Sequence, residues 1–204
     1  MKNQMKITVL TAALAAFALP VLAQDANSSA PVTSQSINQR KENQQDRIAN
    51  GVQSGQLTAG ETANLEKKEA AVNQEERDMR KVDNGKLTQA DKQTLNQQQN
   101  QMSKQIYQDK HNSAVQNTNP KSEVGKRAEN QQDRIAQGIK SGQLTAGETA
   151  HIESNEAKIN QEVHNDRQAN GGKLTPQERK QVNRQQNKTS RQIYRDKHNG
   201  RVAK

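Results

Sequence analysis

Apolar side chains recur along most of this chain at helical spacing. The two clearest stripes are Leu65, Val72 and Met79, and then Leu95, Met102 and Ile106. Intervals of four and seven residues place side chains on one face of an α-helix. Between these positions the sequence is rich in Gln, Asn and charged residues, and no run beyond residue 23 is continuously apolar. The pattern predicts amphipathic helices with narrow apolar faces.

This pattern of apolar and polar positions occurs twice along the chain. Residues 42–112 return as residues 129–199 at a constant offset of 87, without insertion or deletion, and about three positions in five are identical. The apolar stripes return as Ile152, Ile159 and Val163, and then as Val182, Thr189 and Ile193. Such regular duplication indicates one folding unit used twice. We call residues 40–112 the first copy and 127–199 the second copy; residues 113–126, with Pro120 and Gly125, are expected to be a linker, and 200–204 a tail.

A shorter motif, Gly-x-Leu-Thr-x-x-acid, occurs twice in each copy. Threonine is a preferred N-cap, and an acid three residues later completes a capping box, so the motif predicts the start of a helix. The preceding Gly lets the previous helix end. The four expected boxes are Thr58 with Glu61, Thr88 with Asp91, Thr145 with Glu148, and Thr175 with Glu178.

These signals predict an all-α fold of two tandem three-helix modules, with antiparallel helices joined by short Gly-x-Leu-Thr turns. We expect helices at 41–53, 59–82 and 89–111 in the first copy, and at 128–140, 146–169 and 176–198 in the second. Each copy has few large apolar side chains for its length. We therefore expect the two copies to pack on each other, or the chain to form a homo-oligomer.

The N-terminal residues differ in composition from the rest. Lys2 and Lys6 precede an apolar run that ends near Pro20, and short residues stand at Val21 and Ala23, as signal peptidase requires. This is typical of a secretory signal peptide at 1–23, cleaved after Ala23, which predicts a periplasmic or secreted protein that does not span a membrane. The chain has no Cys, so no disulfide is expected. Residues 24–39, rich in Ser, Ala, Asn and Gln, are expected to be a disordered lead-in.

Two motifs suggest metal binding and need an alternative explanation. Gly-x-Leu-Thr-x-x-Glu matches part of a calcium-binding EF-hand loop, but positions that should carry oxygen ligands are occupied by residues such as Val52 and Arg80. His111 and His198 lie four residues after a Tyr, where they either form a ligand site or end a helix as favourable C-terminal cations. We favour helix capping for both motifs, and therefore expect no metal and no cofactor. No nucleophile or phosphate-loop motif is present, which predicts a non-enzymatic protein.

Charge distinguishes the two copies. Residues 173–199 carry eight bases and two acids, a net +6, whereas the matched residues 86–112 carry four bases and two acids, a net +2. The candidate anion-binding residues are Lys173, Arg179, Lys180, Arg184, Lys188, Arg191, Arg195 and Lys197. We expect part of this charge to be balanced by the preceding acidic helix, which contains Glu148, Glu153, Glu156, Glu162 and Asp166.

The basic segment favours an anionic partner. Lipopolysaccharide, anionic lipid, another polyanion and an acidic protein all fit, and a solvated basic helix with no dedicated partner is the alternative. Expected export argues against chromosomal DNA. The only aromatic residues after the expected signal peptide are Tyr107 and Tyr194, too few to stack single-stranded nucleic acid.

The strings ENQQDRIA, SGQLTAGE, GGKLTP and QIYRDKHN resemble a group of exported bacterial helical repeat proteins, over nearly all of both copies. This resemblance implies no particular function. A looser likeness, through Leu-Thr at helix starts, is to the periplasmic proteins of the Spy and CpxP type, which implies a chaperone or stress-sensing role. Two hypotheses follow: a helical interaction protein with a protein partner, chaperone-like or related to envelope stress, and a binder of anionic surfaces through the basic C-terminal helix.

Overall fold

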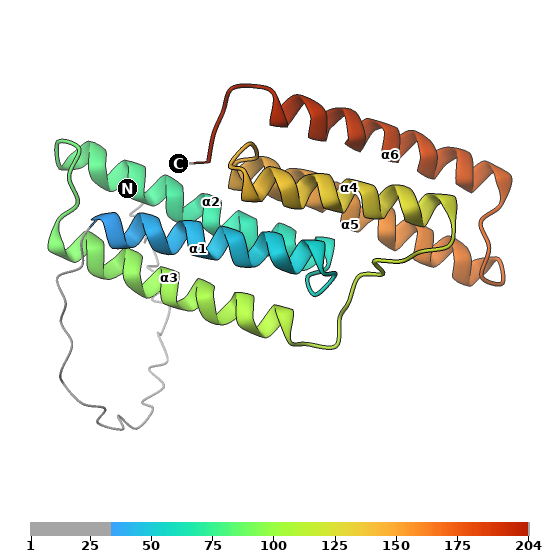
Figure 1. The fold of residues 1–204 in the computed structure, drawn as a ribbon, viewed down its shortest axis with the longest axis horizontal. Coiled ribbons are helices and arrows are strands. Elements are labelled where there is room, and N and C mark those ends of the chain that lie inside the picture. Colours follow the sequence, from blue (N-terminus) through green and yellow to red (C-terminus); the bar gives the residue numbers. More distant parts are fainter. Residues whose placement is uncertain (1–33, 204) are drawn as a thin grey trace, which may run out of the picture. The chain divides into compact units, whose positions relative to one another are not determined.

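A computed structural model describes residues 34–203, and this part of the chain contains six α-helices and no strand (Figure 1). The helices are α1 (Ser34–Gln53), α2 (Ala59–Val82), α3 (Gln89–Lys110), α4 (Glu123–Lys140), α5 (Ala146–Ala169) and α6 (Pro176–Lys197). The all-α fold with three helices in each copy is confirmed. In the described range no helix is both long enough and apolar enough to cross a bilayer. The expected signal peptide at 1–23, and residues 24–33 of the expected lead-in, lie outside the described residues.

All four predicted capping boxes are present. The Glu61 carboxylate accepts a hydrogen bond from the Thr58 backbone N–H at 2.9 Å, while the Thr58 hydroxyl accepts one from the Glu61 N–H at 3.3 Å. The same reciprocal pair begins α3, α5 and α6, at Thr88 and Asp91, Thr145 and Glu148, and Thr175 and Glu178. Four helix starts are therefore fixed by local chemistry that is visible in the sequence.

The first helix of each copy begins earlier than predicted. Residues 34–39 belong to α1 rather than to a disordered lead-in, and residues 123–126 belong to α4 rather than to the linker. The N-cap of α4 is Ser122, whose hydroxyl accepts from the Gly125 N–H without an acidic partner, so this start lacks the motif that identifies the others. The added turns are held by Ile37 and its equivalent Val124, which are buried.

The two copies pack on each other through two pairs of helices. Within each copy the third helix covers the other two: α3 packs on α1 and α2, and α6 packs on α4 and α5. Between the copies, α2 packs on α5 and α1 packs on α4. The expected packing of one copy on the other is therefore confirmed.

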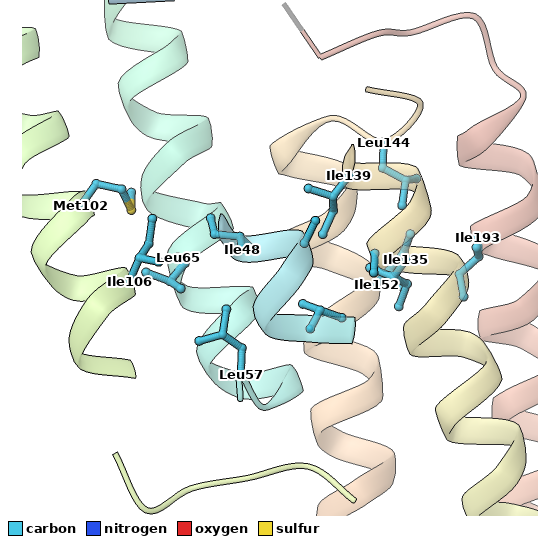
Figure 2. Packing of buried hydrophobic residues seen from close by; sticks show 13 residues of the cluster. Ile48, Leu57, Leu65, Met102, Ile106, Ile135, Ile139, Leu144, Ile152 and Ile193 are labelled. Atoms are coloured by element: carbon cyan, nitrogen blue, oxygen red, sulfur yellow. The ribbon is translucent and has the colours of Figure 1, made fainter. Parts of the chain in front are cut away.

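One apolar cluster joins both copies at their interface. Ile48, Leu65 and Ile106 of the first copy belong to the same cluster as their equivalents Ile135, Ile152 and Ile193 of the second, and all six are fully buried (Figure 2). A smaller apolar cluster lies in each copy, one containing Ile37 and Leu95 and the other Val124 and Val182. The largest apolar core is thus shared, which explains why a single copy has so few apolar side chains.

Buried glutamines complete the packing of each third helix. The Gln44 side-chain amide donates to the Gln99 carbonyl oxygen at 2.7 Å, and the Gln99 amide donates to the Ile37 carbonyl oxygen at 2.9 Å. The second copy repeats both bonds with Gln131, Gln186 and Val124. Buried amide donors need such partners. Glutamines therefore occupy core positions in a chain with a mean hydropathy of −1.22.

Candidate anion-binding surface

The basic helix α6 buries one face and exposes the other. Its buried residues, Val182, Gln186, Thr189 and Ile193, are spaced by four, three and four residues and pack toward α4 and α5. That spacing defines one side of the helix. The opposite side is left to solvent.

Five cations follow one another on the exposed side of α6. They are Lys180, Arg184, Lys188, Arg191 and Arg195, at intervals of four, four, three and four residues, and each is exposed. With a rise of 1.5 Å per residue they extend over about 22 Å of helix. We call these five residues the cationic stripe.

No ion pair among the described residues involves the cationic stripe. The expectation that the acids of α5 balance part of the basic segment 173–204 is met only outside the stripe, where Glu148 pairs with Arg201. Glu153 and Glu156 are buried, and Glu162 accepts hydrogen bonds from the side-chain amides of Gln181 and Gln185 at 2.7 and 2.8 Å. Glu148 completes a capping box and lies 3.6 Å from Arg201 of the tail. The positive charge of the stripe therefore remains unneutralised in the folded protein.

The other three candidate residues lie apart from the stripe. Lys173 is exposed in the turn before α6, and Arg179 is exposed in the first turn of the helix, about 100° around the axis from Lys180. Lys197 is half-buried, and its ammonium donates to the Arg134 carbonyl oxygen at 3.4 Å. Burial and the nearby Arg134 lower the pKa of Lys197. Lys197 thus belongs to the contact between α6 and α4 rather than to the exposed surface.

The first copy provides a version of the same surface with one cation instead of five. At the positions equivalent to the stripe, α3 carries Gln93, Gln97, Gln101, Lys104 and Gln108, all exposed. Four of the five cations are therefore replaced by glutamine on an equivalent helix. The charge is not required for helix packing, because α3 packs on its copy as α6 does.

Both candidate histidines end a helix. His198 is the C-cap of α6, its Nδ1 lies 2.6 Å from the Tyr194 carbonyl oxygen, and its ring stacks on the Tyr194 ring with centroids 4.3 Å apart. His111 and Tyr107 repeat this arrangement, with a distance of 2.7 Å and centroids 4.1 Å apart. Within residues 34–203 no three His, Cys, Asp or Glu side chains group as metal ligands would. Both histidines therefore act as C-caps, as the helix-capping interpretation predicts.

A second feature, missed by the sequence analysis, is a set of buried carboxyl groups. Glu66 and Glu69 on α2, and their equivalents Glu153 and Glu156 on α5, are at most 2% exposed. One signal was available: Glu69 lies four residues after Leu65, and Glu156 four after Ile152, so both continue an apolar stripe. Acidic side chains on that face point into the core.

A groove of about 900 Å³ lies between the linker, α4 and α5. Ala128 and Val163 are among its lining residues. The equivalent residues of the first copy, Lys41 and Glu76, form an ion pair with a distance of 3.0 Å. The second copy therefore has a groove beside two positions that the first copy fills with charged side chains.

Comparisons with known proteins give no match: no family model, no curated protein and no solved structure is detectably similar to this chain. The resemblance to exported helical repeat proteins remains a prediction.

Proposed function

We propose that this protein is an exported, non-enzymatic interaction protein that binds phosphate-bearing anionic envelope surfaces through the cationic stripe of α6. The observation that carries the proposal is the contrast between two equivalent helices. The exposed face of α6 has five cations without a carboxylate partner, whereas α3 has glutamine at four of these positions. A surface that carries positive charge without nearby negative charge attracts a negatively charged partner.

Lipid headgroups and lipopolysaccharide both present clustered phosphates, and the stripe suits such a surface. Its three arginines can each hold a phosphate through two parallel hydrogen bonds. Each Lys or Arg near an anionic membrane surface contributes about 1 kcal/mol. Tyr194 is 60% exposed beside Arg191 and Arg195, and an exposed tyrosine ring is suited to the headgroup region of a membrane.

The test is co-sedimentation of residues 24–204 with phosphatidylcholine vesicles, with and without phosphatidylglycerol or lipopolysaccharide. We expect binding only to the anionic vesicles, weakening steeply as salt is added because exposed charges are screened. The matched variant is K180Q/R184Q/K188Q/R195Q, which gives α6 the glutamines that α3 already carries. It should lose about 100- to 1000-fold in affinity, the effect of four cations at about 1 kcal/mol each. Salt-resistant binding, or equal binding by this variant, would refute the proposal.

The described surface supports a chaperone-like role, in which the protein would hold unfolded client proteins, less well than it supports anion binding. Its exposed large apolar residues are Val82, Tyr107, Val115, Tyr194 and Val202, which belong to separate segments of the chain. A client-binding surface needs a contiguous apolar patch. A salt-resistant suppression of client aggregation would favour the chaperone-like role over the anionic-surface role.

A further inference from the structure

The interface between α2 and α5 encloses four glutamate side chains. Glu66 and Glu69 come from α2, and their equivalents Glu153 and Glu156 come from α5. Three of them are fully buried, and Glu69 is 2% exposed. Glu66 and Glu153, from opposite copies, are close enough to repel each other across the interface when both are ionised. Four carboxyl groups are thus concentrated where the two copies meet. We call them the buried glutamate cluster.

The cluster has few hydrogen-bond donors. The Glu66 carboxyl accepts from the Gln45 side-chain amide of α1 at 3.3 Å, and the Glu153 carboxyl accepts from Gln132 of α4 at 2.9 Å. Neither oxygen of Glu156 accepts a hydrogen bond from any described residue. A buried carboxylate without donors is costly, whereas the neutral acid loses much less on leaving water.

Among the described residues, the one cation that acts on the cluster is Lys41, which belongs to the first copy. The Lys41 ammonium of α1 attracts Glu69, but it lies 3.0 Å from Glu76, which also bonds Arg80. In the second copy, Ala128 and Val163 stand at the positions of Lys41 and Glu76. The titratable groups that act on the four carboxyls are therefore Lys41, Glu76 and the cluster itself, from α1, α2 and α5.

Burial makes these groups weak acids. It raises the pKa of Glu69 and Glu156 to about 7, that of Glu153 to about 8, and that of Glu66 well above its ordinary value of 4.5. Repulsion from Glu69 and Glu153 adds to the effect of burial on the pKa of Glu66. In the unfolded chain these carboxyls regain ordinary pKa values. The stability that their protonation provides is therefore fully present below about pH 4.5 and is lost as pH rises through about 7 to 8.

We propose that the buried glutamate cluster is a proton-controlled clasp between the two copies. When the four carboxyls are protonated, α2 and α5 close on each other. When they lose their protons, Glu66 and Glu153 face each other as negative charges across the interface, Glu156 is left buried without a hydrogen-bond donor, and the copies separate. Separation exposes the apolar cluster that the copies share, at Ile48, Leu65 and their equivalents. This device is independent of the cationic stripe.

The first experiment measures urea unfolding of residues 24–204 between about pH 5 and about pH 9. We expect the folding equilibrium constant to fall more than about 100-fold over this range, since one carboxyl with its pKa raised from 4.5 to about 7 accounts for that much. The variant E66Q/E69Q/E153Q/E156Q keeps neutral side chains of similar shape and should show a nearly flat profile. The exposed control E42Q should keep the wild-type profile. A flat wild-type profile overturns the proposal.

The second experiment measures opening of the interface directly. The chain has no Cys, so Q101C and K188C place two spin labels at equivalent exposed positions of α3 and α6. We expect one narrow inter-label distance at acidic pH and a longer, broader distribution at alkaline pH, with part of the helical circular dichroism lost because neither copy encloses the shared apolar cluster alone. The four-glutamine variant should keep the narrow distance throughout. A pH-independent distance in the wild-type background contradicts the clasp.

A third variant keeps the test decisive if the four-glutamine chain does not fold. A128K gives the second copy the cation that the first copy has at Lys41, without an acid equivalent to Glu76 to oppose it. The new ammonium should lower the pKa of Glu156, as Lys41 opposes the rise at Glu69. We therefore expect the loss of stability at alkaline pH to be several-fold smaller than in the wild type. An unchanged pH profile for this folded variant counts against the proposal.

Discussion

Four of the six described helices begin with the same two side chains, a threonine and an acid three residues later. These positions were predicted correctly because a capping box is formed by neighbours in sequence. The starts of α1 and α4 were predicted too late, because they depend on Ile37 and Val124 packing against distant residues. Burial of Glu66 and Glu153 was missed for the same reason: it is created by the meeting of two copies.

Two helical glycines, Gly51 and Gly60, should respond differently to substitution by alanine. A Cβ added at Gly51 of α1 would lie 2.7 Å from the Leu57 side chain, whereas a Cβ at Gly60 of α2 would meet nothing within 4 Å. We expect G51A to lower the free energy of unfolding by about 1 to 3 kcal/mol, because it overpacks the core. G60A should raise it or leave it unchanged, because alanine favours a helix over glycine by up to about 1 kcal/mol. Urea unfolding measures both, and equal effects would show that Leu57 does not fill this space.

At the scale of elements, α3 and α6 are equivalent helices that differ mainly on their exposed faces. The basic character of α6 was predictable from composition, but its lack of ion pairs was not. Glu153 and Glu156 turn toward the interior, and Glu162 is occupied by glutamine side chains. Charge counts along the sequence do not show which way an acidic side chain points. Of the eight predicted residues, five form the cationic stripe and three lie apart from it, and the acids of α5 form no ion pair with the stripe.

Because the cationic stripe is exposed to solvent, its removal should have little effect on the free energy of unfolding. K180Q/R184Q/K188Q/R195Q should change the free energy of unfolding by less than about 0.5 kcal/mol per substitution, because each side chain is exposed and without an ion pair. Thermal and urea unfolding at neutral pH measure the change. A large destabilisation would mean that the stripe has a structural role, and any loss of vesicle binding by this variant would then have another cause.

At the scale of the whole described chain, duplication allows a polar sequence to fold. Each copy contributes about half of the central apolar cluster, and neither copy encloses it alone. The small apolar content of one copy predicted this dependence, but only the structure shows that α2–α5 and α1–α4 are the contacts that provide it.

A single copy should therefore be poorly folded. Each copy can be produced alone, as residues 34–121 or residues 122–204. The first fragment would expose Ile48, Leu65 and Ile106 to water, and the second would expose their equivalents Ile135, Ile152 and Ile193. We expect each fragment to lose most of its helical circular dichroism or to dimerise, and the mixture to regain helicity. Fragments that are helical, monomeric and cooperatively folded would show that the shared cluster is dispensable.

The proposed function requires that a stripe of cations on a helix of this fold is sufficient for binding an anionic surface. The most direct test moves the charge from α6 to α3, by combining K180Q/R184Q/K188Q/R195Q with Q93K/Q97R/Q101K/Q108R, so that net charge and architecture are unchanged. Co-sedimentation with vesicles containing phosphatidylglycerol should show binding lost in the glutamine variant and restored, with its salt dependence, in the transfer variant. A transfer variant that folds but does not bind, or a glutamine variant that binds like the wild type, would contradict the account.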